Sequence, residues 1–240
     1  MSVFCQPTLQ QANELYQKAQ QNIKEGKINE AIDNYENAAV IFQQNGDEKN
    51  AIISRLNEYD ILIKIGKIND LETKLNDLNN NSTKIFGENT KITAYTNTLL
   101  GRYWFMMNDS EKAIFYLNKS LEINKTLFGE KSLEYANALQ DYALLLYQIQ
   151  MNDSALSCLN KVLEIYTLNN ATNNPNIINI YFNIGNVLMA VGQTDNSVEI
   201  FLKLLDILKS QNMLKSEQSA KIYTSLGNAY TSKKDFVVAN

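Results

Sequence analysis

The chain has 240 residues, of which 45% are hydrophobic and 20% are charged, and its formal net charge at pH 7 is −4. This hydrophobic content excludes a disordered tail, and the length fits one or two globular domains or one elongated array. A weakly acidic chain without basic runs is a poor match for nucleic acid, because neutralised phosphates supply most of that affinity. The same charge argues against binding to an anionic membrane surface.

The sequence contains no histidine, which is the commonest general base and the commonest metal ligand in proteins. It also lacks a glycine-rich phosphate loop, since neither GKIN segment has the upstream glycine and the following Ser or Thr that such a loop needs. We therefore predict a non-enzymatic protein with no catalytic residues, no cofactor and no bound metal.

The two cysteines, Cys5 and Cys158, are far apart in the sequence. They indicate free thiols in a reducing compartment, because a disulfide framework needs more cysteines at regular spacings. The first residues have neither the basic region nor the apolar core of a secretory signal. No run approaches the roughly 18 apolar residues that a membrane span requires. We expect a cytoplasmic protein without membrane insertion.

Two prolines and nine glycines are few for this length, which favours long helices joined by short turns. After a loose arm over residues 1–9, the first helix pair is expected to begin at Gln10. Gly26 ends its first helix, and Ala31, Tyr35 and Ala38 line one face of the second at i, i+4 and i+7.

The same pattern returns along the chain. Gly66 follows Gly26 by 40 residues, and the apolar face of the next helix consists of Leu71, Leu75 and Leu78. From the third pair the period is 42, and the second helices are expected to use these faces: Ala113, Leu117 and Leu121; Ala155, Leu159 and Leu163; Ser197, Phe201 and Leu205. Self-similarity at a fixed spacing predicts an array of antiparallel helix pairs.

Small residues recur in the first helices, at Gly101, Ala143, Gly185 and Gly227. A glycine inside a helix costs up to about 1 kcal/mol relative to alanine, so we expect it where the partner helix approaches closely. The facing residues are predicted to be the small ones of the second helices: Ala113, Ala155, Ser197 and Ala239.

Other glycines mark the connections. Gly26, Gly66 and Gly192 are expected to form left-handed caps after the first helices, whereas Gly46, Gly87 and Gly129 lie between pairs. The predicted organisation is an arm, 1–9, and one array, 10–240, with about five complete pairs and a truncated sixth: 10–46, 47–89, 90–131, 132–174, 175–215 and 216–240. The short last helix, with Phe236, Val237 and Val238, is expected to fray.

These residues resemble the tetratricopeptide repeat family, whose small, aromatic and alanine positions match Gly227, Tyr230 and Ala239, and also Ala19, Ala31, Tyr35 and Ala38. The usual period of that family is about 34 residues. The period of 42 is similar to the variant in kinesin light chains and G-protein signalling modulators, and about the first 45 residues also resemble soluble NSF attachment proteins. The resemblance implies an all-α fold, a right-handed α-solenoid of antiparallel helix pairs.

The family also implies a concave groove lined by the first helices. Carried onto this sequence, the groove positions are Tyr95, Leu99, Arg102, Asn137, Asp141, Leu144, Asn179, Asn183, Asn186, Lys221, Ser225 and Asn228. A ladder of amides can hold the main chain of an extended peptide, because each amide both donates and accepts hydrogen bonds. The alternative is composition alone, since asparagine is 33 of the 240 residues.

The leading hypothesis is therefore an adaptor or scaffold that binds a protein or peptide partner in its groove. The second is that the array is the sensor or cargo-binding portion of a larger signalling or intracellular-transport protein, with an effector domain beyond residue 240. An enzyme is the third and least favoured reading.

Overall fold

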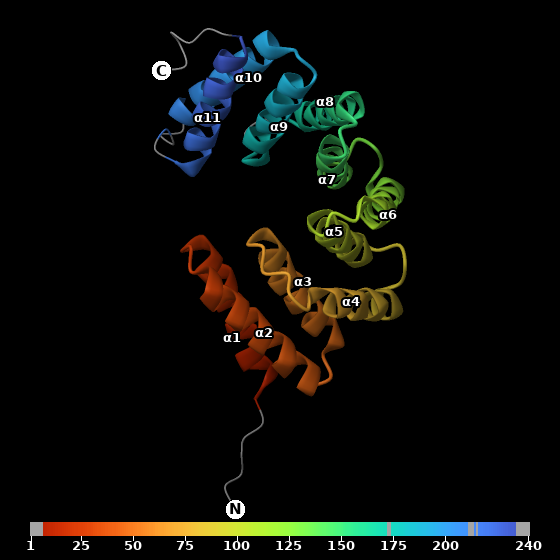
Figure 1. Ribbon diagram of the computed structural model, residues 1–240. Coiled ribbons are helices and arrows are strands. Elements are labelled where there is room, and N and C mark those ends of the chain that lie inside the picture. Colours follow the sequence, from red (N-terminus) through yellow and green to blue (C-terminus); the bar gives the residue numbers. More distant parts are fainter. Residues whose placement is uncertain (1–6, 172–173, 211–213, 215, 234–240) are drawn as a thin grey trace, which may run out of the picture. The chain divides into compact units, whose positions relative to one another are not determined.

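The computed structural model describes residues 7–171, 174–210, 214 and 216–233 (Figure 1). Within these residues the chain is helical and contains no strand, which confirms the predicted all-α solenoid of helix pairs. The helices are α1 (Leu9–Lys24), α2 (Ile28–Gln44), α3 (Glu48–Lys64), α4 (Leu71–Phe86), α5 (Lys91–Met106), α6 (Ser110–Phe128), α7 (Leu133–Gln148), α8 (Asn152–Leu168), α9 (Asn176–Ala190), α10 (Thr194–Ser210) and α11 (Glu217–Ser232). The expected fraying helix lies outside the described residues.

The helices form two compact units, Met1–Leu127 and Phe128–Asn240. In the first unit α1 packs on α2, α2 on α3, α3 on α4 and α4 on α5, and the first helices α3 and α5 also touch. In the second unit α7 packs on α8, α8 on α9, α9 on α10 and α10 on α11, while α9 also touches α7 and α11. The division into six segments stays a prediction.

Several helices begin with a hydroxyl residue that caps free backbone N–H groups. The Thr8 side chain accepts from the Gln11 backbone N–H at 3.3 Å, and the Gln11 side chain accepts from the Thr8 backbone N–H at 2.8 Å. Thr90 and Thr93 make the same reciprocal pair before α5. Such caps contribute about 1 kcal/mol each and fix where a helix starts.

A left-handed residue follows the first helix of each of five pairs. These residues are Gly26, Gly66, Asn108, Gln150 and Gly192. The N–H of the next residue donates to the carbonyl five residues earlier, at 2.8–3.0 Å, which closes the helix end as a Schellman motif. The predicted glycine caps are thus confirmed, and Asn108 and Gln150 adopt the same conformation without a glycine.

The buried face of the second helices differs in one position from the prediction. In α6, α8 and α10 the third residue of the face is at i+7, since Ser120, Val162 and Leu204 are fully buried. Leu121, Leu163 and Leu205, which were predicted at i+8, are only half-buried. Seven residues are close to two turns of a 3.6-residue helix, so i+7 returns to the same face more nearly than i+8.

Gly185 lies where α9 and α10 approach closely. A Cβ atom on Gly185 would lie 2.6 Å from the ring of Phe201, which is fully buried. The predicted partner Ser197 also contacts Gly185, because its hydroxyl donates to the Gly185 carbonyl at 2.7 Å. The expected close approach is present, but the side chain that fills the space belongs to Phe201.

Gly101 repeats this arrangement in the first unit, where a Cβ atom would lie 2.5 Å from Leu117. Leu117, and not the predicted Ala113, therefore occupies the space. For Gly227, no atom of the described residues lies within 4 Å of the Cβ position, and its expected partner Ala239 is outside them.

Two carboxyl groups are buried among the described residues of the first unit, those of Asp60 and Glu58. Glu58 of α3 is 5% exposed. Burial raises the pKa of Glu58 to about 7, and the like charge of Glu36 adds to the shift, whereas Lys74 and Arg55 oppose it. The protonated form is therefore favoured in the folded chain at pH values where an ordinary glutamate is ionised.

Gly185→Leu is expected to lower the free energy of unfolding by roughly 1–3 kcal/mol, because the new side chain overlaps the fixed Phe201 ring. Chemical denaturation measures the change. Ala190→Leu, at the exposed end of the same helix, is the control and should change it by less than about 0.5 kcal/mol. Equal stabilities of Gly185→Leu and the parent would remove Gly185 from the close-approach role.

Glu58 should also make stability depend on pH. Because its pKa is higher in the folded chain than the ordinary value of 4.5, the stability that it contributes is present below pH 4.5 and is lost as pH rises through about 7. We expect a loss of roughly 3 kcal/mol from this group. Urea unfolding at pH 5 and pH 8 should show the loss in the parent and in Glu122→Gln, an exposed control. Glu58→Gln should lack it, and an unchanged pH dependence in that variant would contradict the assignment.

Candidate peptide-binding site

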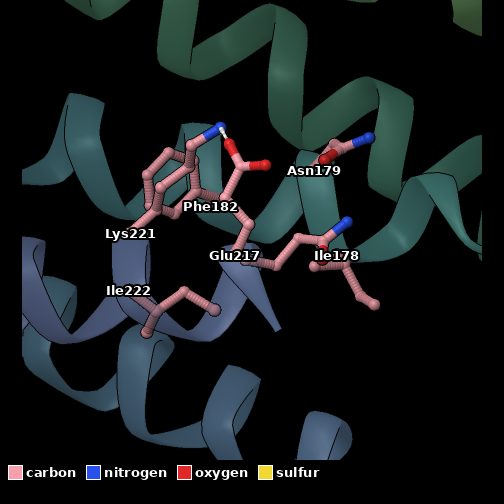
Figure 2. A pocket seen from close by; sticks show the side chains of 7 residues that line it. Ile178, Asn179, Phe182, Glu217, Lys221 and Ile222 are labelled. Carbon is pink, nitrogen blue, oxygen red and sulfur yellow. Dashed lines mark ion pairs between the residues drawn. The ribbon is translucent and has the colours of Figure 1, made fainter. Parts of the chain in front are cut away.

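A pocket of about 250 Å³ lies between α9 and α11 in the second unit (Figure 2). The described residues that line it are Ile178, Asn179, Phe182, Glu217, Gln218, Lys221 and Ile222. It brings together two predicted groove residues, Asn179 and Lys221, which stand at equivalent positions of adjacent repeats. The sequence prediction missed the other five, although three of them continue the apolar faces of their helices.

The pocket combines an apolar base with a polar rim. Ile178 and Ile222 are 8% and 1% exposed. Phe182 is half-buried, and its ring centroid lies 6.0 Å from that of Phe201. Asn179 and Lys221 are exposed. Such a combination suits a ligand that buries an apolar group while polar groups fix its orientation.

An ion pair spans one turn of α11 at the rim. The Lys221 ammonium lies 2.7 Å from the Glu217 carboxylate. The hydrogen bond from Lys221 holds the pKa of Glu217 below its ordinary value. Both side chains are well exposed, so the pair contributes little to stability and is free to exchange partners with a ligand.

The other predicted asparagines of this unit differ in their surroundings. Asn183 is half-buried. The half-buried Asn186 accepts a hydrogen bond from the Ser225 hydroxyl at 3.3 Å, and so links α9 to α11. Asn228 is exposed. Asn186 and Ser225 therefore join two first helices, and they do not line the pocket.

The predicted residues of α7 lie outside the pocket lining. The side-chain oxygen of Asn137 accepts a hydrogen bond from the Tyr166 hydroxyl at 2.7 Å and another from the side-chain amide of Asn176 at 3.4 Å. Asp141 and Leu144 are half-buried. Asn137 thus helps to join α7, α8 and α9, which is a structural task that the sequence pattern did not indicate.

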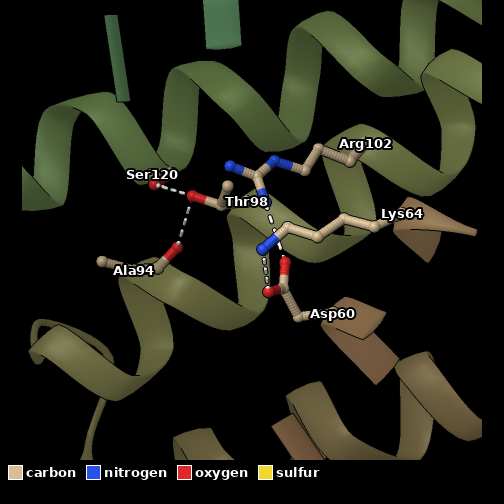
Figure 3. A network of polar contacts seen from close by, with 6 residues as sticks. All are labelled: Asp60, Lys64, Ala94, Thr98, Arg102 and Ser120. Atoms are coloured by element: carbon tan, nitrogen blue, oxygen red, sulfur yellow. Dashed lines mark hydrogen bonds and ion pairs between the residues drawn. The ribbon is translucent and has the colours of Figure 1, made fainter. Parts of the chain in front are cut away.

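Arg102 belongs to the first unit and forms an ion pair that joins two first helices, α5 and α3 (Figure 3). Its guanidinium lies 2.9 Å from one oxygen of Asp60, and the Lys64 ammonium lies 2.5 Å from the other. Asp60 is 8% exposed, so the two cations compensate a nearly buried carboxylate. Arg102 therefore serves to attach α5 to α3.

Leu99 corrects the groove prediction. Its side chain is fully buried, so it belongs to the core and cannot line a groove, whereas Tyr95 is half-buried. The helix face that carries these positions contains further buried polar groups. The Thr98 hydroxyl lies 2.7 Å from that of Ser120 and donates to the Ala94 carbonyl at 3.3 Å (Figure 3).

Two other kinds of site are not found in the described part of the chain. It contains no group of three or more Cys, Asp or Glu residues that could hold a metal ion. None of its helices combines the length and the apolar character that crossing a membrane requires.

Comparison of the sequence with family models places two segments in a repeat class. Residues 107–167 and residues 178–207 each match a model described as tetratricopeptide repeat. Among curated proteins, no sequence matches this chain.

Several solved structures share the fold. A Rap protein complexed with Competence and Sporulation Factor has a TM-score of 0.71 and 13% identity, over 95% of this chain and 72% of that one. BtubC (BKLC) from P. vanneervenii has a TM-score of 0.64 and 15% identity, over 96% and 85% of the two chains. A putative kinesin light chain of Podosopora anserina with nearly identical TPR-like repeats has a TM-score of 0.60 and 15% identity, over 85% and 87%.

The consecutive helix pairs and the pocket between two first helices define a helical repeat protein. Two segments of this chain therefore match tetratricopeptide repeats, and its fold is similar to that of kinesin light chain repeat structures.

Replacing Arg102 tests its structural role. Arg102→Ala leaves the nearly buried Asp60 with Lys64 alone, so we expect the free energy of unfolding to fall by about 1–2 kcal/mol. Lys64→Ala removes the more exposed cation and should cost less than about 1 kcal/mol. Thermal or urea unfolding of both variants shows which of them loses more stability. A larger loss for Lys64→Ala than for Arg102→Ala would contradict the structural role of Arg102.

Proposed function

We propose that this protein is a scaffold that captures a peptide segment of a partner protein at the pocket between α9 and α11. Tetratricopeptide repeats indicate a protein partner, because stacked helical repeats create extended binding surfaces, and such repeats are typically non-enzymatic. The observation that carries the proposal is the pairing of Asn179 and Lys221 around an apolar base. Equivalent positions of adjacent repeats can contact successive residues of one extended segment.

The chemistry of the pocket suggests how the segment binds. An apolar side chain of the ligand would contact Ile178, Phe182 and Ile222, which supply the hydrophobic part of the affinity. The Asn179 amide would bond one peptide unit of the ligand main chain, donating to its carbonyl and accepting from its N–H. Glu217 and Lys221 would bond polar groups on either side, because their ion pair is exposed.

A similar fold supports the proposal by analogy. The Rap protein structure contains Competence and Sporulation Factor, so a repeat array of related shape accommodates a bound factor. At 13% identity the likeness concerns the fold, and the residues that bind in this chain follow from its own pocket.

A second function is compatible with the same site. The array resembles putative kinesin light chain repeats over 85% of its length. The repeats would then be the sensor or cargo-binding portion of a larger signalling or transport protein in the cytoplasm. The proposed pocket would still contact the partner, and the full-length gene distinguishes the two readings.

Loss of the two rim residues should weaken partner capture. Affinity purification with mass spectrometry from cytoplasmic extract would first identify partners of the parent, and a peptide scan of the top partner would give the bound segment. Asn179→Ala with Lys221→Ala should weaken binding of that peptide by about 10- to 100-fold, since each lost polar contact leaves an unpaired group. Calorimetry measures the affinity.

The matched control is Asn196→Ala with Lys209→Ala, which removes the same residue types from exposed positions of α10. It should bind like the parent, and both double variants should melt like the parent because all four sites are exposed. Asn183→Ala tests whether the amide ladder extends along α9, because Asn186 is already bonded to Ser225. Undiminished peptide binding by the Asn179 and Lys221 variant would refute the proposed site.

A further inference from the structure

A second pocket, in the first unit, is formed by α2, α3 and α4. Its volume is about 240 Å³, and the described residues that line it are Glu36, Ala39, Val40, Arg55, Glu58, Tyr59 and Lys74. The elements concerned are two second helices and the first helix between them. It shares no lining residue with the pocket between α9 and α11, so the function proposed above neither requires nor explains it.

Glu58 is the more deeply buried of the two carboxyl groups of this pocket. Its residue is 5% exposed, while Glu36 and Lys74 are exposed and Arg55 is half-buried. Among the described residues Glu58 forms no hydrogen bond and no ion pair, and the Arg55 guanidinium donates to Gln43 instead. The carboxyl oxygens of Glu58 are not fully enclosed, so water or a ligand in the pocket can reach them and supply the donors that a carboxyl group in a protein normally has.

The surroundings indicate which ligand would satisfy Glu58. The carboxyl group is an acceptor when ionised, and Glu36 places a second carboxylate on the same pocket. Ala39, Val40 and the Tyr59 ring supply apolar and aromatic walls, which suit the stem of a basic side chain and the face of a guanidinium. Lys74 is exposed to water and able to turn away from an incoming cation.

We propose that this pocket binds an organic cation, a guanidinium or primary ammonium group, which donates hydrogen bonds to the buried Glu58 carboxylate. The cation can be the side chain of an arginine or lysine in a partner protein or a small free amine, since both present the same donor group. Binding converts Glu58 to its ionised form and releases its proton to solvent.

The proton release gives the site a pH signature. The charged groups that face Glu58 are Glu36 from α2, Arg55 from its own helix and Lys74 from α4. With the pKa of free Glu58 near 7, a cation should bind about tenfold more tightly at pH 8 than at pH 6, because a larger fraction of Glu58 is already ionised. An anion drawn to Arg55 and Lys74 would show the opposite trend, since it favours protonated Glu58.

Three probes test the proposal on the whole chain labelled with nitrogen-15. They are agmatine, the blocked peptide acetyl-Ala-Arg-Ala-amide and the same peptide with citrulline, a neutral isostere of arginine. We expect agmatine, the arginine peptide or both to shift the amide resonances of Val40, Tyr59 and Lys74, and we expect the affinity to be higher at pH 8. The citrulline peptide should leave these resonances unchanged. Agmatine binding identifies a free amine as sufficient, and binding of the peptide alone identifies a protein side chain.

Glu58→Gln should lose this binding by at least tenfold while keeping the helical circular dichroism of the parent. Glu122→Gln, an exposed acid on α6, is the matched control and should bind like the parent. The proposal is overturned if neither cation shifts these resonances, if Glu58→Gln binds as the parent does, or if inorganic phosphate shifts them and binds more weakly as pH rises.

Discussion

The turn between the two helices of a pair is the constraint on which this structure depends. A left-handed residue after the first helix, and a hydrogen bond that spans five residues, fix where the second helix begins. In the fifth pair this bond is donated by Gln193, which is midway in sequence between Gly185 and Phe201. The turn therefore determines that Phe201 meets Gly185. In the third pair the equivalent bond is donated by Asp109, which is midway in sequence between Gly101 and Leu117, and these two residues meet in the same way.

Packing between pairs then follows from polar as well as apolar contacts. The first helices of neighbouring pairs are joined by Arg102 with Asp60 in one unit and by Ser225 with Asn186 in the other. In a repeat array each unit is stabilised by its neighbours, so such contacts supply interface energy as well as register. Residues of the first helices consequently divide between holding the array together and lining the pocket.

The sequence was sufficient to predict the helix pairs, because spacing alone reveals a repeat. It predicted left-handed caps only at glycines, and missed Asn108 and Gln150, since asparagine adopts this conformation only occasionally and glutamine rarely, so neither residue type marks a cap as clearly as glycine does. It also placed the third buried residue at i+8, because leucine at that position is conspicuous, whereas the buried residue at i+7 in α6 is Ser120.

The site could be predicted only in part for a related reason. Equivalent positions of the repeats selected Asn179 and Lys221 correctly as neighbours around one pocket. The same rule selected Leu99, which is core, and Asn137, whose hydrogen bonds come from Tyr166 and Asn176. A position in a repeat determines a direction from the helix axis, but what stands in that direction depends on neighbouring side chains far away in sequence.

Amide hydrogen exchange at the turns tests the dependence of the pairs on this geometry most directly. The backbone amides of Asp109, Met151 and Gln193 donate to the carbonyl five residues earlier. They directly follow the left-handed residues Asn108, Gln150 and Gly192, respectively. If the turn geometry is independent of residue type, all three amides exchange much more slowly than in an unstructured peptide and to a similar extent. Exchange of Asp109 and Met151 at unstructured rates, with Gln193 alone protected, would contradict it.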